Sequence, residues 1–364
     1  MFIRTEYGGN SPAGRKEADM GSEGQQDAMD SDANGGASAG RSMQAVVQDT
    51  YGSAEVLRLA RIARPEVADK NVLVRVRAAS LDRGTWHLMS GRPYLLRLGF
   101  GLRRPRNPVP GRSLAGTVVE VGSAVTRFSA GDEVYGIGPG SLAEYAVARE
   151  DKLARKPVNA SFEQAAAVPV SGMTALQALC DAGRVKQGQK VLIIGASGGV
   201  GSFAVQLAKA LGAEVTGVAS TAKLDLVRSL GADHVIDYTV DDFADGERRY
   251  DLILDIAGNA SLSRLRRALT PSGTVVITGG EEGGDFSGGM NRQFRALALS
   301  LFVRQRLTFF VAKERSRDLE RLTEFIEAGK ATPSIDRVYP LTDAPDAMRH
   351  LAAGNARGKI AISI

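Results

Sequence analysis

The chain has 364 residues, of which 43% are hydrophobic and 24% charged, with a formal net charge of +5. This is the composition of an ordinary globular protein, and the length suggests two domains that each bury a core. No apolar run approaches the roughly 20 residues that a membrane-spanning helix needs. The single cysteine, Cys180, excludes a disulfide framework and suits a reducing compartment. We therefore expect a cytoplasmic protein without a membrane anchor.

The first 42 residues differ from the rest of the chain. They are rich in Gly, Ser, Ala and acidic residues and nearly lack aromatic side chains, so they cannot bury enough surface to offset their ordering entropy. Their carboxylates argue against an organellar transit peptide, and they lack the apolar core of a secretion signal. We predict a disordered tail over residues 1–42. The folded pattern begins at Met43, which is an equally good candidate for the natural start.

Two patterns divide the remaining chain. Residues 43–168 alternate short β-type runs with glycine turns, which is typical of a compact β domain of barrel type. Residues 169–304 alternate strand-like and helix-like segments, which predicts a parallel sheet covered by helices. Residues from about 305 to 364 carry a helix over 317–328 and two strand-like runs. We expect this last part to complete the first domain.

The segment KVLIIGASGGVG, residues 190–201, is the most informative motif of the chain. A short apolar strand precedes the glycines, a helix over residues 200–211 follows, and a second strand is expected at Glu214–Ala219. This order brings backbone N–H groups at a helix N-terminus to the pyrophosphate of a dinucleotide. The predicted contacts of that loop are Ala196, Ser197, Gly198, Gly199 and Val200.

The end of the second strand indicates which dinucleotide binds. An NAD site normally has an acidic residue there, which holds the ribose 2′-hydroxyl. Here Ser220, Thr221 and Lys223 follow the strand, and two hydroxyls and an ammonium suit a 2′-phosphate. The two hydroxyl residues also suit the cap of a following helix, and both roles are compatible. The sequence therefore favours NADP(H).

Four motifs occur in a telling order: PGRSLAGTVVEVG, GDEVYG, AAAVPVSGMTALQAL and GASGGVG. Together they resemble the medium-chain dehydrogenase/reductase superfamily, in its zinc-independent quinone oxidoreductase (zeta-crystallin-like) branch, over residues 43–364. The resemblance implies an α/β fold: a GroES-like β-barrel catalytic domain at 43–168, completed by about 305–364, and a Rossmann doubly wound parallel-sheet domain that binds NADP at 169–304. It also implies hydride transfer to a quinone, an α,β-unsaturated carbonyl or a related carbonyl substrate.

The sequence does not favour a metal. Zinc-dependent relatives need a catalytic cysteine, a His-Glu pair and four further cysteines for a structural zinc, and one cysteine cannot supply these sets. Where those relatives resemble Gly-His-Glu, this chain has Gly111, Arg112 and Ser113. The histidines at 87, 234 and 350 are scattered. We expect no bound metal.

The segment AASLDRGTWHLMSG resembles the Asn-Pro-x-Asp segment that lines the nicotinamide side of the cleft in quinone reductases. Asp82 stands at the Asn position, Arg83 at the Pro position and Thr85 at the Asp position, so the family's substrate contacts are altered. Asp82 and Thr85 are our catalytic candidates, either for a proton donor or for stabilising an oxyanion. Trp86 and Tyr94 suit an apolar wall beside a flat substrate, or core packing.

The resemblance assigns further residues to the cofactor. It implies that Thr174 and the loop Gly279–Gly280 lie near the nicotinamide and that Tyr238 contacts the adenosine phosphate. It also implies a basic element at the C-terminal border of the cofactor, formed by Asn355, Arg357 and Lys359. Arg357 and Lys359 fit ordinary solvated charges equally well.

The stretch Arg92–Arg112 contains six arginines and no acidic residue, with leucines between them. It fits a lid over an anionic substrate, a partner surface or a nucleic-acid patch, but we favour a solvated loop. Two other functions stay open: an enoyl-thioester reductase, and a low-turnover NADPH-binding regulatory or RNA-binding protein.

We also expect a homodimer. Relatives commonly pair edge strands of their Rossmann sheets, and Gly273–Thr278 is an apolar candidate for such an edge. The apolar stretch Phe294–Phe310 either adds surface to that interface or forms a helix buried in one subunit.

Overall fold

The computed structural model describes residues 42–257, 260–279 and 284–364. The predicted tail, apart from Ser42, lies outside them. Ser42 itself opens strand β1 (Ser42–Val47), which pairs with β2 (Arg58–Ala63) in an antiparallel ribbon. Strand β1 therefore includes one residue, Ser42, that we had placed in the tail.

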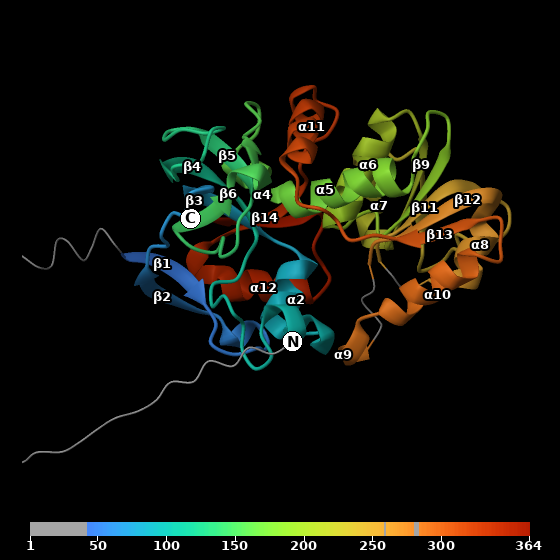
Figure 1. Cartoon of the computed structure of the whole chain (residues 1–364). Coiled ribbons are helices and arrows are strands. Elements are labelled where there is room, and N and C mark those ends of the chain that lie inside the picture. Colours follow the sequence, from blue (N-terminus) through green and yellow to red (C-terminus); the bar gives the residue numbers. More distant parts are fainter. Residues whose placement is uncertain (1–41, 258–259, 280–283) are drawn as a thin grey trace, which may run out of the picture. The chain divides into compact units, whose positions relative to one another are not determined.

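The first domain is built on a seven-stranded sheet in the order β14-β15-β3-β4-β5-β7, with β6 paired to β3. Its C-terminal strand β15 runs antiparallel to β3 and puts Ile360 opposite Leu81. Residues at the end of the chain thereby lie in the sheet of the N-terminal domain (Figure 1). The strands are β3 (Asn71–Leu81), β4 (Ser113–Val121), β5 (Glu133–Ile137), β6 (Tyr145–Arg149), β7 (Leu153–Arg155), β14 (Ile335–Pro340) and β15 (Lys359–Ser363).

Short helices connect these strands. Helix α2 begins at Arg83 because the Asp82 carboxylate caps it. Its C-cap is Gly91, whose φ of 65° is left-handed. The others are α3 (Arg97–Phe100), α4 (Phe162–Ala167) and α12 (Ala344–Ala352), with the single turns η1 (Ala54–Val56), η2 (Tyr94–Leu96), η3 (Glu150–Lys152) and η6 (Leu341–Asp343); α2 itself spans Arg83–Ser90.

The second domain is a six-stranded parallel sheet in the order β10-β9-β8-β11-β12-β13. Its central strands are buried on both faces, which explains their continuous Val, Leu and Ile runs. The strand order reverses beside β8, and the ligand-binding crevice of a doubly wound sheet lies at this reversal. The strands are β8 (Lys190–Ile194), β9 (Glu214–Ala219), β10 (His234–Asp237), β11 (Tyr250–Asp255), β12 (Leu269–Ile277) and β13 (Arg306–Phe309). The predicted α/β fold is confirmed.

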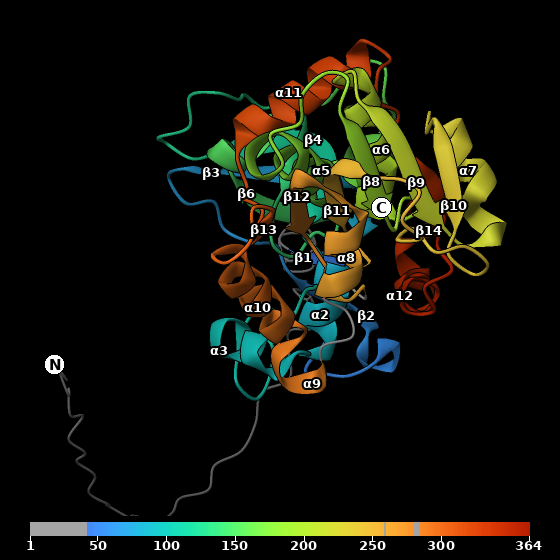
Figure 2. The same cartoon turned by 90° about the vertical axis from the view of Figure 1, so that its right-hand side faces the viewer.

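Helices cover this sheet. Helix α10 lies beside β13 at one end of the sheet (Figure 2). Helix α11 packs on α5 of the second domain and on β7 of the first, so this helix joins the two domains. The helices are α5 (Pro169–Gln177), η4 (Ala178–Ala182), α6 (Gly199–Ala210), η5 (Thr221–Lys223), α7 (Leu224–Ser229), α8 (Leu262–Ala268), α9 (Gly284–Ser287), α10 (Met290–Ser300) and α11 (Ser316–Glu327).

The edge strand differs from our expectation. The segment Gly273–Thr278 is no edge, because β13 pairs in parallel with β12 from Thr274 to Ile277. Strand β13 is therefore the edge, and residues 306–309 belong to the second sheet rather than to the first domain. The sequence hid this strand because it follows an apolar helix within the single apolar stretch Phe294–Phe310. That stretch is neither one helix nor fully buried, since Phe302 in its turn is 84% exposed.

Candidate functional site

The glycine loop joins β8 to α6. Gly195 has a φ of 90°, and its carbonyl oxygen lies 2.1 Å from where a Cβ of residue 201 would stand, so a side chain there collides with backbone. Ala196 and Ser197 are buried, and Ala196 packs on the neighbouring strand. A Cβ on Gly198 would instead have no atom closer than 3.6 Å. The N-terminus of α6, which includes Gly199 and Val200, is thus open to an anion.

The segment before β15 runs along this loop. The Gly358 N–H donates to the Ser197 carbonyl at 2.9 Å, and Gly358 forms a parallel bridge with Gly198. Lys359 is 2% exposed, and its Nζ donates to the Leu81 carbonyl at 2.8 Å. Burial lowers the pKa of Lys359, and the nearby Asp82 carboxylate opposes that shift. Lys359 is therefore no solvated charge. Its aliphatic side-chain carbons lie beside Gly199 of the glycine loop.

Hydroxyl groups and one carboxylate gather at the ends of β9 and β10. Thr221 Oγ1 donates to Asp237 Oδ2, and Thr239 donates to Oδ1 from its backbone N at 3.0 Å and its hydroxyl at 2.7 Å. These hydrogen bonds lower the pKa of the Asp237 carboxyl. Tyr238 follows and is 61% exposed. The Ser220 side chain makes no cap hydrogen bond, so the helix-cap role suggested for it is not used.

Lys223 connects this corner to the C-terminal segment. Its Nζ donates to the carbonyl oxygens of Gly354 at 2.9 Å and Ala356 at 3.0 Å. Burial lowers the pKa of Lys223; the Asp336 carboxylate raises it, and the positive charge of Arg357 lowers it further. The structure thus brings two of the predicted cofactor cations close together. Arg357 and the neighbouring Asn355 are exposed on the same segment.

At the predicted nicotinamide end, the Thr174 hydroxyl donates to the Val170 carbonyl within α5 at 2.7 Å. A Cβ on Gly279 would lie 1.9 Å from the Ile256 carbonyl oxygen, so only glycine fits this close crossing of strand ends. Gly280, which we predicted beside it, lies outside the described residues.

The two catalytic candidates form a helix cap. Asp82 Oδ1 accepts hydrogen bonds from the Thr85 backbone N at 2.8 Å and from its hydroxyl at 3.1 Å. Thr85 is fully buried and Asp82 is 8% exposed. Within the described part of the chain, Asp82 Oδ2 is buried without a hydrogen-bond partner. The geometry gives both residues a structural task at the start of α2, and their catalytic role stays a prediction.

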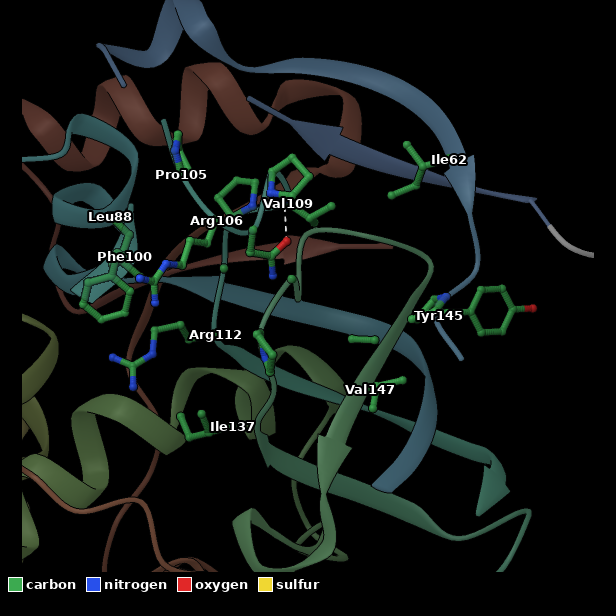
Figure 3. Close-up of a pocket in the computed structure, with 18 of the residues that line it drawn as sticks. Ile62, Leu88, Phe100, Pro105, Arg106, Val109, Arg112, Ile137, Tyr145 and Val147 are labelled. Carbon is green, nitrogen blue, oxygen red and sulfur yellow. Dashed lines mark hydrogen bonds between the residues drawn. The ribbon is translucent and has the colours of Figure 1, made fainter. Parts of the chain in front are cut away.

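A cavity of about 690 Å³ is lined by Leu88 of α2 and by Arg112, which precedes β4 (Figure 3). Leu88, Phe100, Arg106 and Arg112 line one end of it, and Ile62 and Tyr145 lie toward the other. Its wall is largely apolar, with arginine and lysine side chains and one carboxylate, that of Glu314.

An ion-paired triad borders the cavity. Arg112 Nη2 pairs with Glu314 Oε1, and Lys152 Nζ pairs with Oε2 of the same carboxylate. Burial raises the pKa of the Glu314 carboxyl, but the hydrogen bond from Lys152 and the charge of Arg112 outweigh it, and the pKa lies below its ordinary value of 4.5. From the sequence, Arg112 stood only for the missing zinc ligand and for one of the six arginines of the basic stretch Arg92–Arg112. No local signal pointed to Glu314, which lies 202 positions away.

The basic stretch Arg92–Arg112 is only partly a solvated loop. Arg97 lies over the rings of Tyr51 and Tyr94, and Arg92 pairs with Asp285 of α9 at 3.2 Å. Trp86 and Tyr94, expected at a substrate wall, line a separate cavity of about 450 Å³. Two arginines of the stretch, as noted, line the larger cavity.

No group of three His, Cys, Asp or Glu side chains suited to a metal ion occurs within residues 42–257, 260–279 and 284–364. Over those same ranges no helix has both the length and the apolar character needed to cross a membrane. The lone cysteine is half-buried in η4, and burial raises the pKa of its thiol.

Both halves of the chain match known families. Residues 68–158 match the alcohol dehydrogenase GroES-like domain, and residues 230–362 match the family described as zinc-binding dehydrogenase. The chain is 33% identical over 342 residues to the chloroplast envelope quinone oxidoreductase homolog of Arabidopsis thaliana, covering 89% of this chain and 99% of that protein. The chain belongs to the medium-chain dehydrogenase/reductase superfamily, in its quinone oxidoreductase branch.

Two further members of this superfamily resemble the chain. The NADPH-dependent alkenal/one oxidoreductase, chloroplastic, of Arabidopsis thaliana is 35% identical over 341 residues, covering 90% of this chain and 81% of that protein. The solved quinone oxidoreductase from Coxiella burnetii superposes with a TM-score of 0.78 at 29% identity, covering 89% and 99% of the two chains. The recognised superfamily and the α/β fold are thus both confirmed.

Proposed function

We propose that the protein is an NADPH-dependent oxidoreductase that transfers a hydride to a quinone, an α,β-unsaturated carbonyl or a related carbonyl compound, without a metal. The observation that carries the proposal is the corner where β9 ends. Lys223 and Arg357 lie together there. Two carboxylates of the described residues are near them: that of Asp237 accepts from hydroxyl and backbone donors, and that of Asp336 pairs with His350 at 2.8 Å. Two cations whose neighbouring carboxylates are already paired suit a 2′-phosphate.

The remaining cofactor contacts follow from the loop geometry. The open approach at Gly198 and the N–H groups that begin α6 would hold the pyrophosphate. Thr174 and Gly279 would border the nicotinamide. When bound, the reduced nicotinamide supplies the hydride, which leaves the protein to position the acceptor and stabilise its charge.

Metal-free chemistry is supported by the donor set. The chain has one cysteine, and the zinc-type Gly-His-Glu position carries Arg112, whose guanidinium is paired with Glu314 and would repel a cation. A cytoplasmic location also stays a proposal, since the two plant relatives described above are named for the chloroplast.

A panel of acceptors tests the proposal. NADPH oxidation is followed with a quinone, an enone and a crotonyl thioester, with NADH as the comparison cofactor. We expect turnover of the quinone or the enone. Fastest turnover of the thioester would favour the enoyl-thioester reductase, for which the arginines of the larger cavity would meet a phosphorylated carrier. Tight NADPH binding without turnover of any acceptor would favour the regulatory or RNA-binding alternative.

A further inference from the structure

Arg112 is connected to the predicted cofactor loop through two intervening side chains, Asp82 and Lys359. A Cβ on Gly199 would stand 2.8 Å from Lys359 Cδ, and the charge of Lys359 interacts with that of Asp82. A Cβ on Gly84 would stand 3.1 Å from Asp82 Oδ1 and 3.9 Å from Arg112 Nη1. The guanidinium of Arg112 is thus placed at the start of α2, where the barrel domain meets the glycine loop and its C-terminal neighbour.

The second domain holds this guanidinium in place through Glu314. The backbone beside Glu314 is tied to α5, because Gln177 donates to the Lys313 carbonyl at 2.7 Å and accepts from the Lys313 N–H at 2.9 Å. Gln177 follows Thr174, the predicted neighbour of the nicotinamide, by one turn of the same helix. Arg112 is therefore fixed between α2 and the helix that borders the cofactor.

The guanidinium keeps donors for a ligand. Its side chain is 35% exposed, and Glu314 is the one partner of its N–H groups among residues that the structure describes. Arg112 and Lys152 share the single carboxylate of Glu314. Leu88 and Phe100 line the same end of the cavity, so an apolar part of a substrate would lie beside the guanidinium.

We propose that Arg112 binds the carbonyl oxygen of the substrate and stabilises the negative charge that develops on it, while Glu314 positions the guanidinium. The inference rests on the proposed function. In that reaction the β-carbon of an α,β-unsaturated carbonyl accepts the hydride from the reduced nicotinamide, and the electrons of the C=C bond move to form an enolate. Arg112 neutralises the enolate oxygen, and a proton from solvent then reaches the α-carbon.

The kinetic test compares three variants with an enone as acceptor. Arg112→Gln keeps polarity without charge and is expected to lower kcat by roughly a hundredfold, while Arg112→Lys keeps part of the activity. Glu314→Gln leaves the guanidinium unanchored and is expected to lower kcat less, with rescue by Glu314→Asp. The matched control is Arg155→Gln, because Arg155 pairs with Asp132 through two hydrogen bonds and does not line the cavity. Its kcat is expected to stay unchanged.

A second readout needs no turnover. The absorbance of bound 4-nitrophenol, whose phenolate mimics the enolate, is followed against pH. In the unmutated protein its apparent pKa should lie at least about one unit lower than in Arg112→Gln, because a cation within contact distance favours the anion. Glu314→Gln should show an intermediate value.

The outcomes separate the two proposals. Normal kcat in Arg112→Gln, or an unchanged nitrophenol pKa, overturns the role of Arg112 while leaving the reductase function intact. An unmutated protein that turns over no acceptor, yet shifts the nitrophenol pKa through Arg112, overturns the reductase function and keeps the oxyanion site.

Discussion

At the scale of single residues, Lys223 has two tasks that a comparison of NADPH and NADH affinities can separate. It ties the C-terminal segment to the cofactor domain through the Gly354 and Ala356 carbonyls. With Arg357 it also supplies positive charge where a 2′-phosphate would lie. The first task affects any dinucleotide, whereas the second affects only the phosphorylated one.

We expect NADPH to bind at least tenfold more tightly than NADH, which corresponds to about 1.4 kcal/mol. Lys223→Ala should erode that preference and leave NADH affinity nearly unchanged, as measured by fluorescence titration of both cofactors. Lys209→Ala is the control, because Lys209 pairs with Asp233 at the far end of α6. An equal loss of both affinities would mean that Lys223 only anchors the C-terminal segment.

At the scale of elements, the glycine loop owes its shape to one close contact and its function to one open position. A Cβ on Gly201 would stand 2.1 Å from the Gly195 carbonyl oxygen, whereas a Cβ on Gly198 would have no atom nearer than 3.6 Å. A methyl group at residue 201 should therefore affect stability, and a methyl group at residue 198 should affect cofactor binding.

We expect Gly201→Ala to lower the melting temperature by several degrees, because the new Cβ must displace backbone. Gly198→Ala should keep the melting temperature and lose roughly tenfold or more in NADPH affinity, because its Cβ occupies the open approach to the α6 N-terminus. Thermal unfolding and cofactor titration of both variants check this. Full cofactor affinity in Gly198→Ala would place the pyrophosphate elsewhere.

At the scale of the whole molecule, the Glu314 triad connects the two domains and makes stability depend on pH. The pKa of Glu314 is lowered in the folded protein, so its contribution is fully present above the ordinary carboxyl value of 4.5 and is lost as pH falls through the lowered folded value. Glu314→Gln should be less stable than the unmutated protein at pH 7. Denaturant unfolding at a series of pH values should show the difference shrinking below pH 4.5; a constant difference would contradict the ion-pair account.

We also expect a homodimer, now at β13 rather than at Gly273–Thr278. The unpaired edge of β13 is preceded by Leu301 and Phe302, which are 83% and 84% exposed. Phe302→Glu should shift light scattering from dimer toward monomer. Val240→Glu, 77% exposed beside the opposite edge strand β10, should not. A monomeric unmutated protein at micromolar concentration would refute the prediction.

Elements with local sequence signals could be predicted before the structure was known. The strand–glycine–helix motif at 190–201, the parallel sheet and the helix predicted at 317–328 were readable because each depends on the spacing of neighbouring residues. The residues at the end of β9 were readable for the same reason. The strand β13 could not be predicted. It has only four residues within one apolar stretch, so its sequence shows too little periodicity to distinguish it from the preceding helix.

Contacts between residues far apart in the sequence became known from the folded chain alone. Arg112 and Glu314 form one ion pair across 202 positions, and Lys359 lies buried beneath a loop formed more than 150 positions earlier. Asp82 and Thr85, three positions apart and chemically suited to catalysis, became a helix cap once α2 formed. The physical reason is common to all of these: a side chain's charge and donors are assigned by which partners folding brings within hydrogen-bond distance, and sequence spacing does not encode those partners.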